Sequence, residues 1–198
     1  KIGYYVHMLI QKKKYYLFIE NTREFNLNLI KIRKKFNIIY RNQKNKESIE
    51  DLRIYRNNCK KNGINFYVAN DTKLLSKVKA DGLYISAHNK NLLLRSYSKK
   101  GYLVIGSAHN QKEINLKTKQ GCKVIIFSRL FKTNYSYKKG YLGVQKFNII
   151  SLRSKGRLVP LGGINEKNLC KMNTIKSDAF ACLSAIKKKP AKIINRLF

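Results

Sequence analysis

The chain has 198 residues, of which 43 are Lys or Arg and only 10 are Asp or Glu, so its formal charge is +33. This length suits a single compact domain over residues 1–198, and a hydrophobic content of 43% argues against disorder. The longest apolar runs, such as Val124–Phe127, are far shorter than the roughly 20 residues that a membrane-spanning helix needs. No secretory signal peptide is visible. We therefore expect a cytoplasmic protein with no membrane partner.

The positive charge is spread along the whole chain. The densest basic runs have three residues each: Lys12–Lys14, Arg33–Lys35 and Lys187–Lys189. Asn, Ile, Tyr and Phe are also abundant, and AT-rich codons encode all of these together with Lys, so compositional drift explains the charge. The charge raises nonspecific affinity for phosphates, but it does not predict a specific nucleic-acid partner.

Short apolar runs alternate with segments of helical period. The expected strands are Tyr16–Ile19, Asn37–Arg41, Asn65–Ala69, Gly82–Ser86, Leu103–Ser107, Lys123–Ser128, Leu158–Gly162 and Ala179–Leu183. The expected helices lie near residues 23–35, 47–61, 72–79, 90–99, 111–119, 144–154, 166–173 and 187–196. This alternation predicts parallel strands joined by crossover helices. Eight of each favours a (β/α)8 TIM barrel over an open doubly wound sheet, and neither of the two commonest nucleotide-binding loops is present.

The four cysteines, Cys59, Cys122, Cys170 and Cys182, form no CxxC pair and no zinc spacing. Cys122 and Cys182 fall in apolar runs, where a cysteine is usually a small buried hydrophobe. This pattern also fits a reducing cytoplasm.

Polar residues gather after the predicted strands, where barrels carry their active sites. Gly162 and Gly163 let the backbone approach a ligand closely, and Ser184 adds a hydroxyl at the start of the next helix. The loops after the seventh and eighth strands often hold a phosphate, although a plain tight turn would also explain the glycine pair.

Three further strand ends carry candidate chemistry. Asn70 and Asp71 suit a helix N-cap, but Arg41 across the barrel mouth can bind phosphate bidentately while the Asp71 carboxylate holds Mg²⁺. His109, two residues after Ser107, suits either a general base or a structural histidine.

In this order, the loops resemble the thiamine phosphate synthase/TenI family of (β/α)8 barrels. The resemblance is clearest over residues 36–198, and it is carried by Asn70-Asp71, Ala80–Ile85, Ile105–His109, Phe131–Thr133, Pro160–Ile164 and Leu183–Ile186. It implies an enzyme that joins hydroxymethylpyrimidine diphosphate to thiazole phosphate with Mg²⁺ and releases pyrophosphate.

The resemblance also implies roles by position. Arg41 and Asn70 would hold the diphosphate, Asp71 would bind Mg²⁺, and Ser107 would contact the pyrophosphate. Arg41, Ser107 and His109 form the implied catalytic set. The implied thiazole phosphate pocket consists of Thr133, Gly162, Gly163, Leu183 and Ser184.

The sequence departs from the family pattern in the diphosphate half. The motif Gln-x-Arg-x-Lys reads Ile39-Tyr40-Arg41-Asn42-Gln43, and the second Mg²⁺ carboxylate falls on Asn89. The motif Pro-Thr-x-Thr-Lys reads Lys132-Thr133-Asn134-Tyr135-Ser136, where Lys138 or Lys139 could substitute by reach. A missing carboxylate weakens divalent binding.

Three hypotheses follow from this pattern. The first is a synthase with a weakened Mg²⁺ site. The second is a TenI-like thiazole tautomerase that uses His109 as its base and needs no metal. The third is a non-enzyme, either a barrel that binds a phosphorylated ligand or a basic protein that binds RNA.

Overall fold

The eight predicted strands form a closed parallel barrel in the computed structural model, which describes residues 14–29, 35–42, 47–133 and 140–182. Each strand pairs with the next along the chain, and β8 closes the ring against β1. The strands are β1 Lys14–Ile19, β2 Phe36–Tyr40, β3 Asn65–Ala69, β4 Gly82–Ile85, β5 Leu103–Ala108, β6 Val124–Ser128, β7 Arg157–Leu161 and β8 Ala179–Cys182. The (β/α)8 prediction is confirmed.

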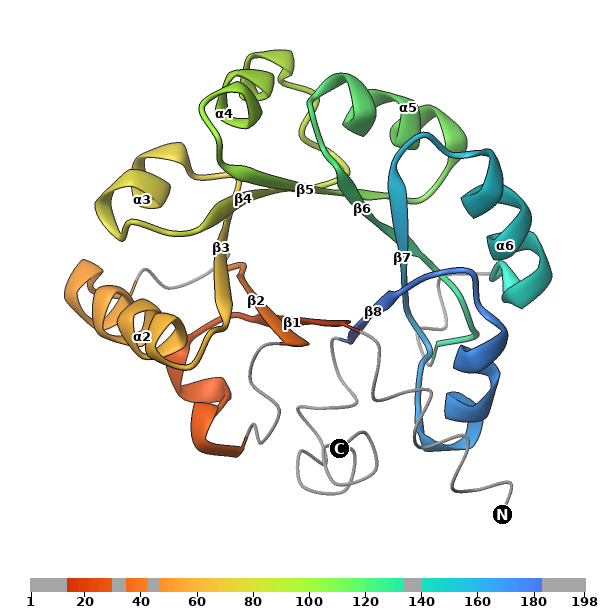
Figure 1. Cartoon of the computed structure of the whole chain (residues 1–198), viewed down its shortest axis with the longest axis horizontal. Helices are drawn as coiled ribbons and strands as arrows, with labels where there is room; N and C mark the ends of the chain where they lie inside the picture. Colours follow the sequence, from red (N-terminus) through yellow and green to blue (C-terminus); the bar gives the residue numbers. More distant parts are fainter. Residues whose placement is uncertain (1–13, 30–34, 43–46, 134–139, 183–198) are drawn as a thin grey trace.

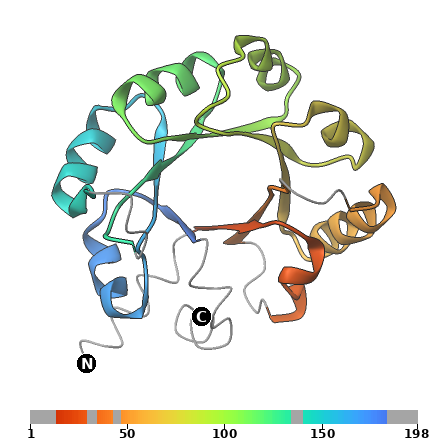
Figure 2. The ribbon, with the colours of Figure 1, turned by 180° about the vertical axis from the view of Figure 1, so that it is seen from behind.

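Helices surround the barrel on its outside, as Figure 1 shows along the barrel and Figure 2 shows from behind. The α-helices are α2 Ile49–Lys61, α3 Thr72–Lys77, α4 Arg95–Lys99, α5 Gln111–Lys119 and α6 Gly143–Arg153. The N-cap of helix α2 is Ser48, whose side chain accepts a hydrogen bond from the Asp51 amide. Its acidic first turn and basic last turn match the helix dipole. No helix within the described ranges is long and apolar enough to cross a membrane.

Three predicted helices differ from the structure. The segment expected to be helical from residue 23 contains two short 3-10 turns, η1 Thr22–Glu24 and η2 Leu27–Leu29. Asn21 and Asn26 each accept a hydrogen bond from a backbone amide two residues ahead, and such local bonds compete with an α-helix.

The fourth predicted helix is divided, since 3-10 helix η4 Leu92–Leu94 precedes α4. The seventh is 3-10 helix η5 Glu166–Thr174, which starts at a capping box formed by Asn165 and Asn168. The predicted helix at residues 187–196 lies outside the described ranges.

Alternate strand residues fill the barrel interior. This inner cluster contains Tyr16, Phe18, Ile39, Tyr67, Tyr84, Ile105, Ile126, Val159, Ala179 and Ala181. The Tyr67 ring lies where a side chain at Gly82 would be, with its nearest atom 2.8 Å from the position a Cβ would take. The barrel interior is therefore a packed core, as in other barrels of this kind, where ligands bind at the ends of the strands.

Candidate active site at the carboxyl ends of the strands

Ser107 lies on the strand next to that of a buried tyrosine, Tyr84, that the sequence analysis did not single out. Ser107 lies in β5 and Tyr84 in β4, both side chains are buried, and they share a hydrogen bond. Burial raises the pKa of Tyr84, while the Ser107 hydrogen bond and the nearby Arg41 charge act in the opposite direction. Arg41 follows β2 directly and is half-buried. Arg41 and Ser107, two of the three predicted catalytic residues, thus both lie at the carboxyl ends of their strands.

Asn70 connects the loops that follow β3 and β4. Its Oδ1 accepts hydrogen bonds from the Ser86 amide at 3.0 Å and from Asn89 Nδ2 at 3.2 Å. Its Nδ2 donates to Ser86 Oγ at 3.1 Å. The Asn70 backbone has a φ of 58°, in the left-handed region that asparagine tolerates better than most residues. The side chains of Asn70, Ser86 and Asn89, called the amide cluster below, form a neutral and accessible group at the barrel mouth.

Asp71 has the structural role that its sequence position also allowed. It is the N-cap of α3, and its Oδ1 accepts a hydrogen bond from the Leu74 amide at 2.8 Å. Within the described ranges, no three His, Cys, Asp or Glu side chains are arranged to hold a metal ion. A magnesium ion here would have one carboxylate, partly engaged in capping, and would depend on substrate oxygens for the rest of its ligands.

His109 is held by a carboxylate. Its Nδ1 lies 3.0 Å from Glu113 Oε2, and the same oxygen accepts a hydrogen bond from the His109 amide at 2.7 Å. The His88 ring lies beside it, with the two centroids 6.3 Å apart. Burial raises the pKa of Glu113, but the hydrogen bonds from His109 outweigh it, so the pKa is lower than usual. No hydrogen bond joins His109 to Ser107 in the part of the chain that the structure describes.

The glycine pair after β7 lets two loops approach each other. The Phe131 amide donates to the Gly162 carbonyl at 3.0 Å. A Cβ on Gly163 would lie 2.5 Å from the Lys132 carbonyl oxygen, so only glycine fits this position. Thr133 is anchored in the same region, because its Oγ1 accepts a hydrogen bond from Arg129 Nη1 at 3.0 Å. Thr133, Gly162 and Gly163 therefore lie in two loops that contact each other.

Leu183, Ser184, Gln43, Ser136 and the two lysines Lys138 and Lys139 lie outside the described ranges. Tyr84, Glu113 and Arg129 are site neighbours that the sequence analysis missed. Among these three, only Glu113 could have been found from the sequence, because it lies four residues after His109 and side chains at this spacing on a helix can pair.

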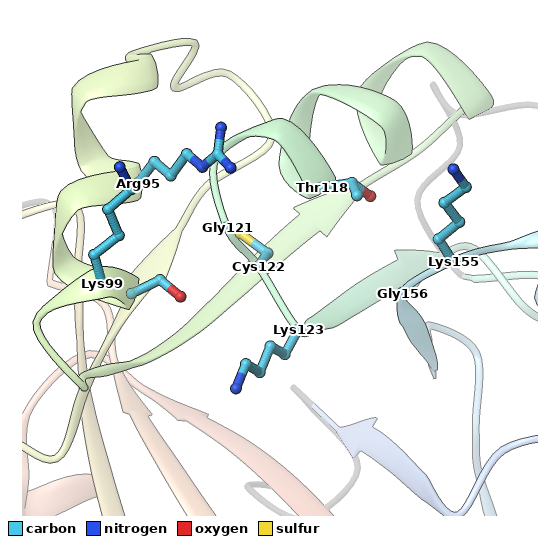
Figure 3. Close-up of a pocket in the computed structure, with 9 residues that line it drawn as sticks. Arg95, Lys99, Thr118, Gly121, Cys122, Lys123, Lys155 and Gly156 are labelled. Atoms are coloured by element: carbon cyan, nitrogen blue, oxygen red, sulfur yellow. The ribbon is translucent and has the colours of Figure 1, made fainter.

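A cavity of about 490 Å³ lies at the opposite end of the barrel, where chain segments enter β6 and β7 (Figure 3). Its lining includes four cations, Arg95, Lys99, Lys123 and Lys155. Arg95 and Lys99 come from α4, and Gly121 follows α5, so the cavity adjoins the carboxyl ends of two helices. Cations are favoured at such ends, which explains their presence without a ligand.

Comparison with known proteins assigns this barrel to a family. The family model described as thiamine monophosphate synthase matches residues 8–186. A thiamine-phosphate synthase of Prochlorococcus marinus is 27% identical over 129 residues, which is 65% of this chain and 37% of that protein. A second, from Prochlorococcus marinus subsp. pastoris, is 26% identical over 142 residues, or 71% of this chain and 39% of that protein. Each match spans less than two fifths of the relative's length.

Solved structures share the architecture. Thiamine phosphate pyrophosphorylase from Pyrococcus furiosus superposes with a TM-score of 0.68 at 18% identity, over 96% of this chain and 99% of that one. 3-Keto-L-gulonate-6-phosphate decarboxylase from Vibrio cholerae gives 0.63 at 13% identity, over 94% and 95%. At these identities the likeness shows the fold alone.

The fold and the strand ends define a (β/α)8 barrel whose polar groups gather at the carboxyl ends of its strands. Because the family model covers most of its length, this chain belongs to the thiamine monophosphate synthase family. The family resemblance found in the sequence is confirmed.

Proposed function

We propose that the chain is a thiamine phosphate synthase, a transferase that acts on hydroxymethylpyrimidine diphosphate and thiazole phosphate. The observation that carries this proposal is the family match over residues 8–186, together with the positions of Arg41 and Ser107 at the carboxyl ends of β2 and β5, where such barrels bind their substrates. A guanidinium and a hydroxyl at the mouth of a packed apolar interior suit a diphosphate, which gains negative charge as it leaves.

In the proposed reaction, the bond between the pyrimidine methylene carbon and the diphosphate oxygen breaks, and its electron pair leaves with pyrophosphate. The thiazole nitrogen then forms the new carbon–nitrogen bond with its lone pair. Arg41 and Ser107 would stabilise the negative charge that develops on the leaving oxygen. Asn70, with both side-chain atoms engaged in the amide cluster, would keep its orientation when the diphosphate binds.

Asp71 is the residue that would hold Mg²⁺ in this proposal. The fit is adequate but weak, since Mg²⁺ is commonly held by one or two carboxylates together with substrate phosphates. When bound, the ion would neutralise charge on the leaving pyrophosphate. Asn89 brings no second negative charge, so a higher Mg²⁺ requirement is expected.

The second phosphate would bind between the loops after β6 and β7. Thr133 and the Gly163 region come together there, and Arg129 adds a positive charge through its contact with Thr133. On the basis of the family resemblance, we propose that Leu183 and Ser184 also bind this second phosphate.

A thiazole tautomerase is the second candidate, and one observation favours it. Glu113 orients the His109 ring through Nδ1, which leaves Nε2 directed away from that contact, as a proton-transferring imidazole requires. This activity would need the thiazole phosphate pocket and no metal.

The test is direct. Purified protein is incubated with both synthase substrates and MgCl2, and thiamine phosphate and pyrophosphate are measured together. The proposal expects stoichiometric products, at least about a hundredfold less activity in Arg41→Ala, and unchanged activity in Lys119→Met, an exposed control. The absence of thiamine phosphate at any protein concentration would reject it. Isomerisation of the thiazole carboxylate phosphate that is lost in His109→Ala would support the second candidate instead.

A further inference from the structure

Lys117 in α5 is fully buried, which is rare for a cation. Its Nζ donates hydrogen bonds to the Asn89 carbonyl at 2.7 Å and to Gln120 Oε1 at 2.8 Å. Both partners are neutral, and Lys117 forms no ion pair within the described ranges. Burial lowers the pKa of Lys117, while Cys122 and Glu113 act weakly in the other direction. Burying a charge against neutral groups is costly, so the position calls for a reason.

The barrel makes room for this lysine. A Cβ on Gly106 would lie 2.9 Å from Lys117 Cγ and Cδ. Gly106 is in the middle of β5, where a side chain would otherwise fill the space between sheet and helix. The aliphatic part of the lysine takes that space on its way to the loop after β4.

Gln120 acts on the same loop. It is fully buried, and its Nε2 donates to the Asn89 carbonyl at 3.0 Å and to the Asn91 carbonyl at 2.9 Å. Together with Lys117, it makes three hydrogen bonds to two carbonyls of this loop. Two buried side chains of the α5 segment therefore hold the backbone of this loop through hydrogen bonds to its carbonyls.

Asn89 connects this support to the candidate site. While its carbonyl is held from beneath, its Nδ2 donates to Asn70 Oδ1 in the amide cluster. We propose that Lys117 and Gln120 are positioning residues for the diphosphate half of the site, which hold Asn89 and through it orient Asn70. The identity of the ligand rests on the proposed function, whereas the fixing of the loop rests on these contacts alone.

The first test compares Lys117→Met with Lys119→Met, which removes an exposed charge from the same helix. Hydrogen exchange is measured for the amides of residues 86–91, at a temperature where circular dichroism shows both variants folded. We expect exchange about tenfold faster in Lys117→Met than in Lys119→Met. We also expect the Kd for pyrophosphate with MgCl2 to rise about tenfold, with the KM for thiazole phosphate within about twofold of wild type.

Equal loop exchange and equal pyrophosphate affinity in the two variants would overturn the inference. If Lys117→Met does not fold, Gln120→Glu decides the matter. That change gives the buried lysine a carboxylate partner, but it removes the donor to the Asn89 and Asn91 carbonyls and places an acceptor against them. Faster loop exchange, at a temperature where circular dichroism shows the variant folded, supports the inference, and wild-type exchange rejects it. A wild-type protein that makes no thiamine phosphate would reject the proposed function and leave the exchange result intact.

Discussion

Asn89 Nδ2 lies 3.2 Å from Asn70 Oδ1, and this contact joins the loops that follow β3 and β4. The family resemblance implies a metal-binding carboxylate at position 89. An ionised carboxylate accepts hydrogen bonds and cannot donate one to Asn70. The neutral residue therefore removes a charge from the implied metal site and at the same time gives Asn70 a partner.

Asn89→Asp should reverse both effects. We expect the free energy of unfolding without metal to fall by about 1–2 kcal/mol, because two oxygen acceptors would then face each other. Added MgCl2 should raise the melting temperature of the variant more than that of the wild type, since binding to the native state stabilises it. The measurement is thermal unfolding in EDTA and in millimolar MgCl2.

Asn91→Asp is the matched control for this change. It adds the same charge to the same loop, but Asn91 Oδ1 only accepts a hydrogen bond, from the Leu93 amide, and a carboxylate can keep that contact. An equal Mg²⁺ response in both variants would show nonspecific charge screening and would contradict a metal site at position 89.

Glu113 should make stability depend on pH. Its pKa in the folded protein is below its ordinary value of 4.5, because hydrogen bonds from His109 outweigh the effect of burial. A lowered folded pKa stabilises the protein at pH values above the unfolded pKa, and this contribution is lost as the pH falls through the folded pKa. We expect Glu113→Gln to lower the free energy of unfolding by about 1 kcal/mol at neutral pH and by about zero in acid.

Urea unfolding at neutral and acidic pH measures this difference. The control is Glu50→Gln, because Glu50 is exposed and its ion pair with Arg53 lies on the surface at a distance of 3.7 Å. Such pairs contribute little, so the control should match the wild type at both pH values. A Glu113→Gln effect that persists in acid would mean that the carboxylate charge is not responsible.

The strands were predictable because barrel strands are buried on both faces and read as apolar runs. All eight match their predicted positions to within two residues at every described end, and β3 matches at both ends. Helix α2 was also predictable, since acidic residues near its start and basic residues in its last turn indicate a helix near 47–61, and the observed helix begins two residues later and ends at the same residue. The segment after β1 was not predictable in this way, because its periodicity is helical while Asn21 and Asn26 form local hydrogen bonds that interrupt it.

The sequence predicted where the site lies but not which side chains contact one another there. Arg41, Asn70 and Ser107 all lie at the expected end of the barrel, which follows from parallel strands alone. Their partners Tyr84 and Asn89 depend on side-chain geometry across strands, which one sequence does not determine. The double role of Asp71 also needed coordinates, because its N-cap bond to Leu74 occupies one carboxylate oxygen.

Thiol reactivity should single out one cysteine. Cys170 is exposed, while burial raises the pKa values of Cys59, Cys122 and Cys182 to about 12. The thiolate is the reactive form, so we expect one fast reaction with a thiol reagent under native conditions, and four in denaturant. Cys170→Ser should abolish the fast phase. More than one fast thiol in the native protein would contradict the buried positions.

Gly163 should be the least replaceable glycine in the loops of the site. Its φ of 69° already disfavours any side chain, and a Cβ would lie 2.6 Å from the Phe131 carbonyl carbon and oxygen. These are backbone atoms, which cannot rotate away, so Gly163→Ala must push apart the loops after β6 and β7. We expect a loss of about 3 kcal/mol or more in the free energy of unfolding.

Gly140→Ala separates this crowding from backbone strain alone. Gly140 has a similar φ of 83°, but a Cβ there would meet nothing within 4 Å. The left-handed conformation by itself should cost about 1–2 kcal/mol. Urea unfolding of both variants gives the difference, and equal losses would show that the loops can separate at no cost. Because Thr133 follows Lys132 directly, a separated loop should also raise the KM for thiazole phosphate in Gly163→Ala while Gly140→Ala leaves it unchanged.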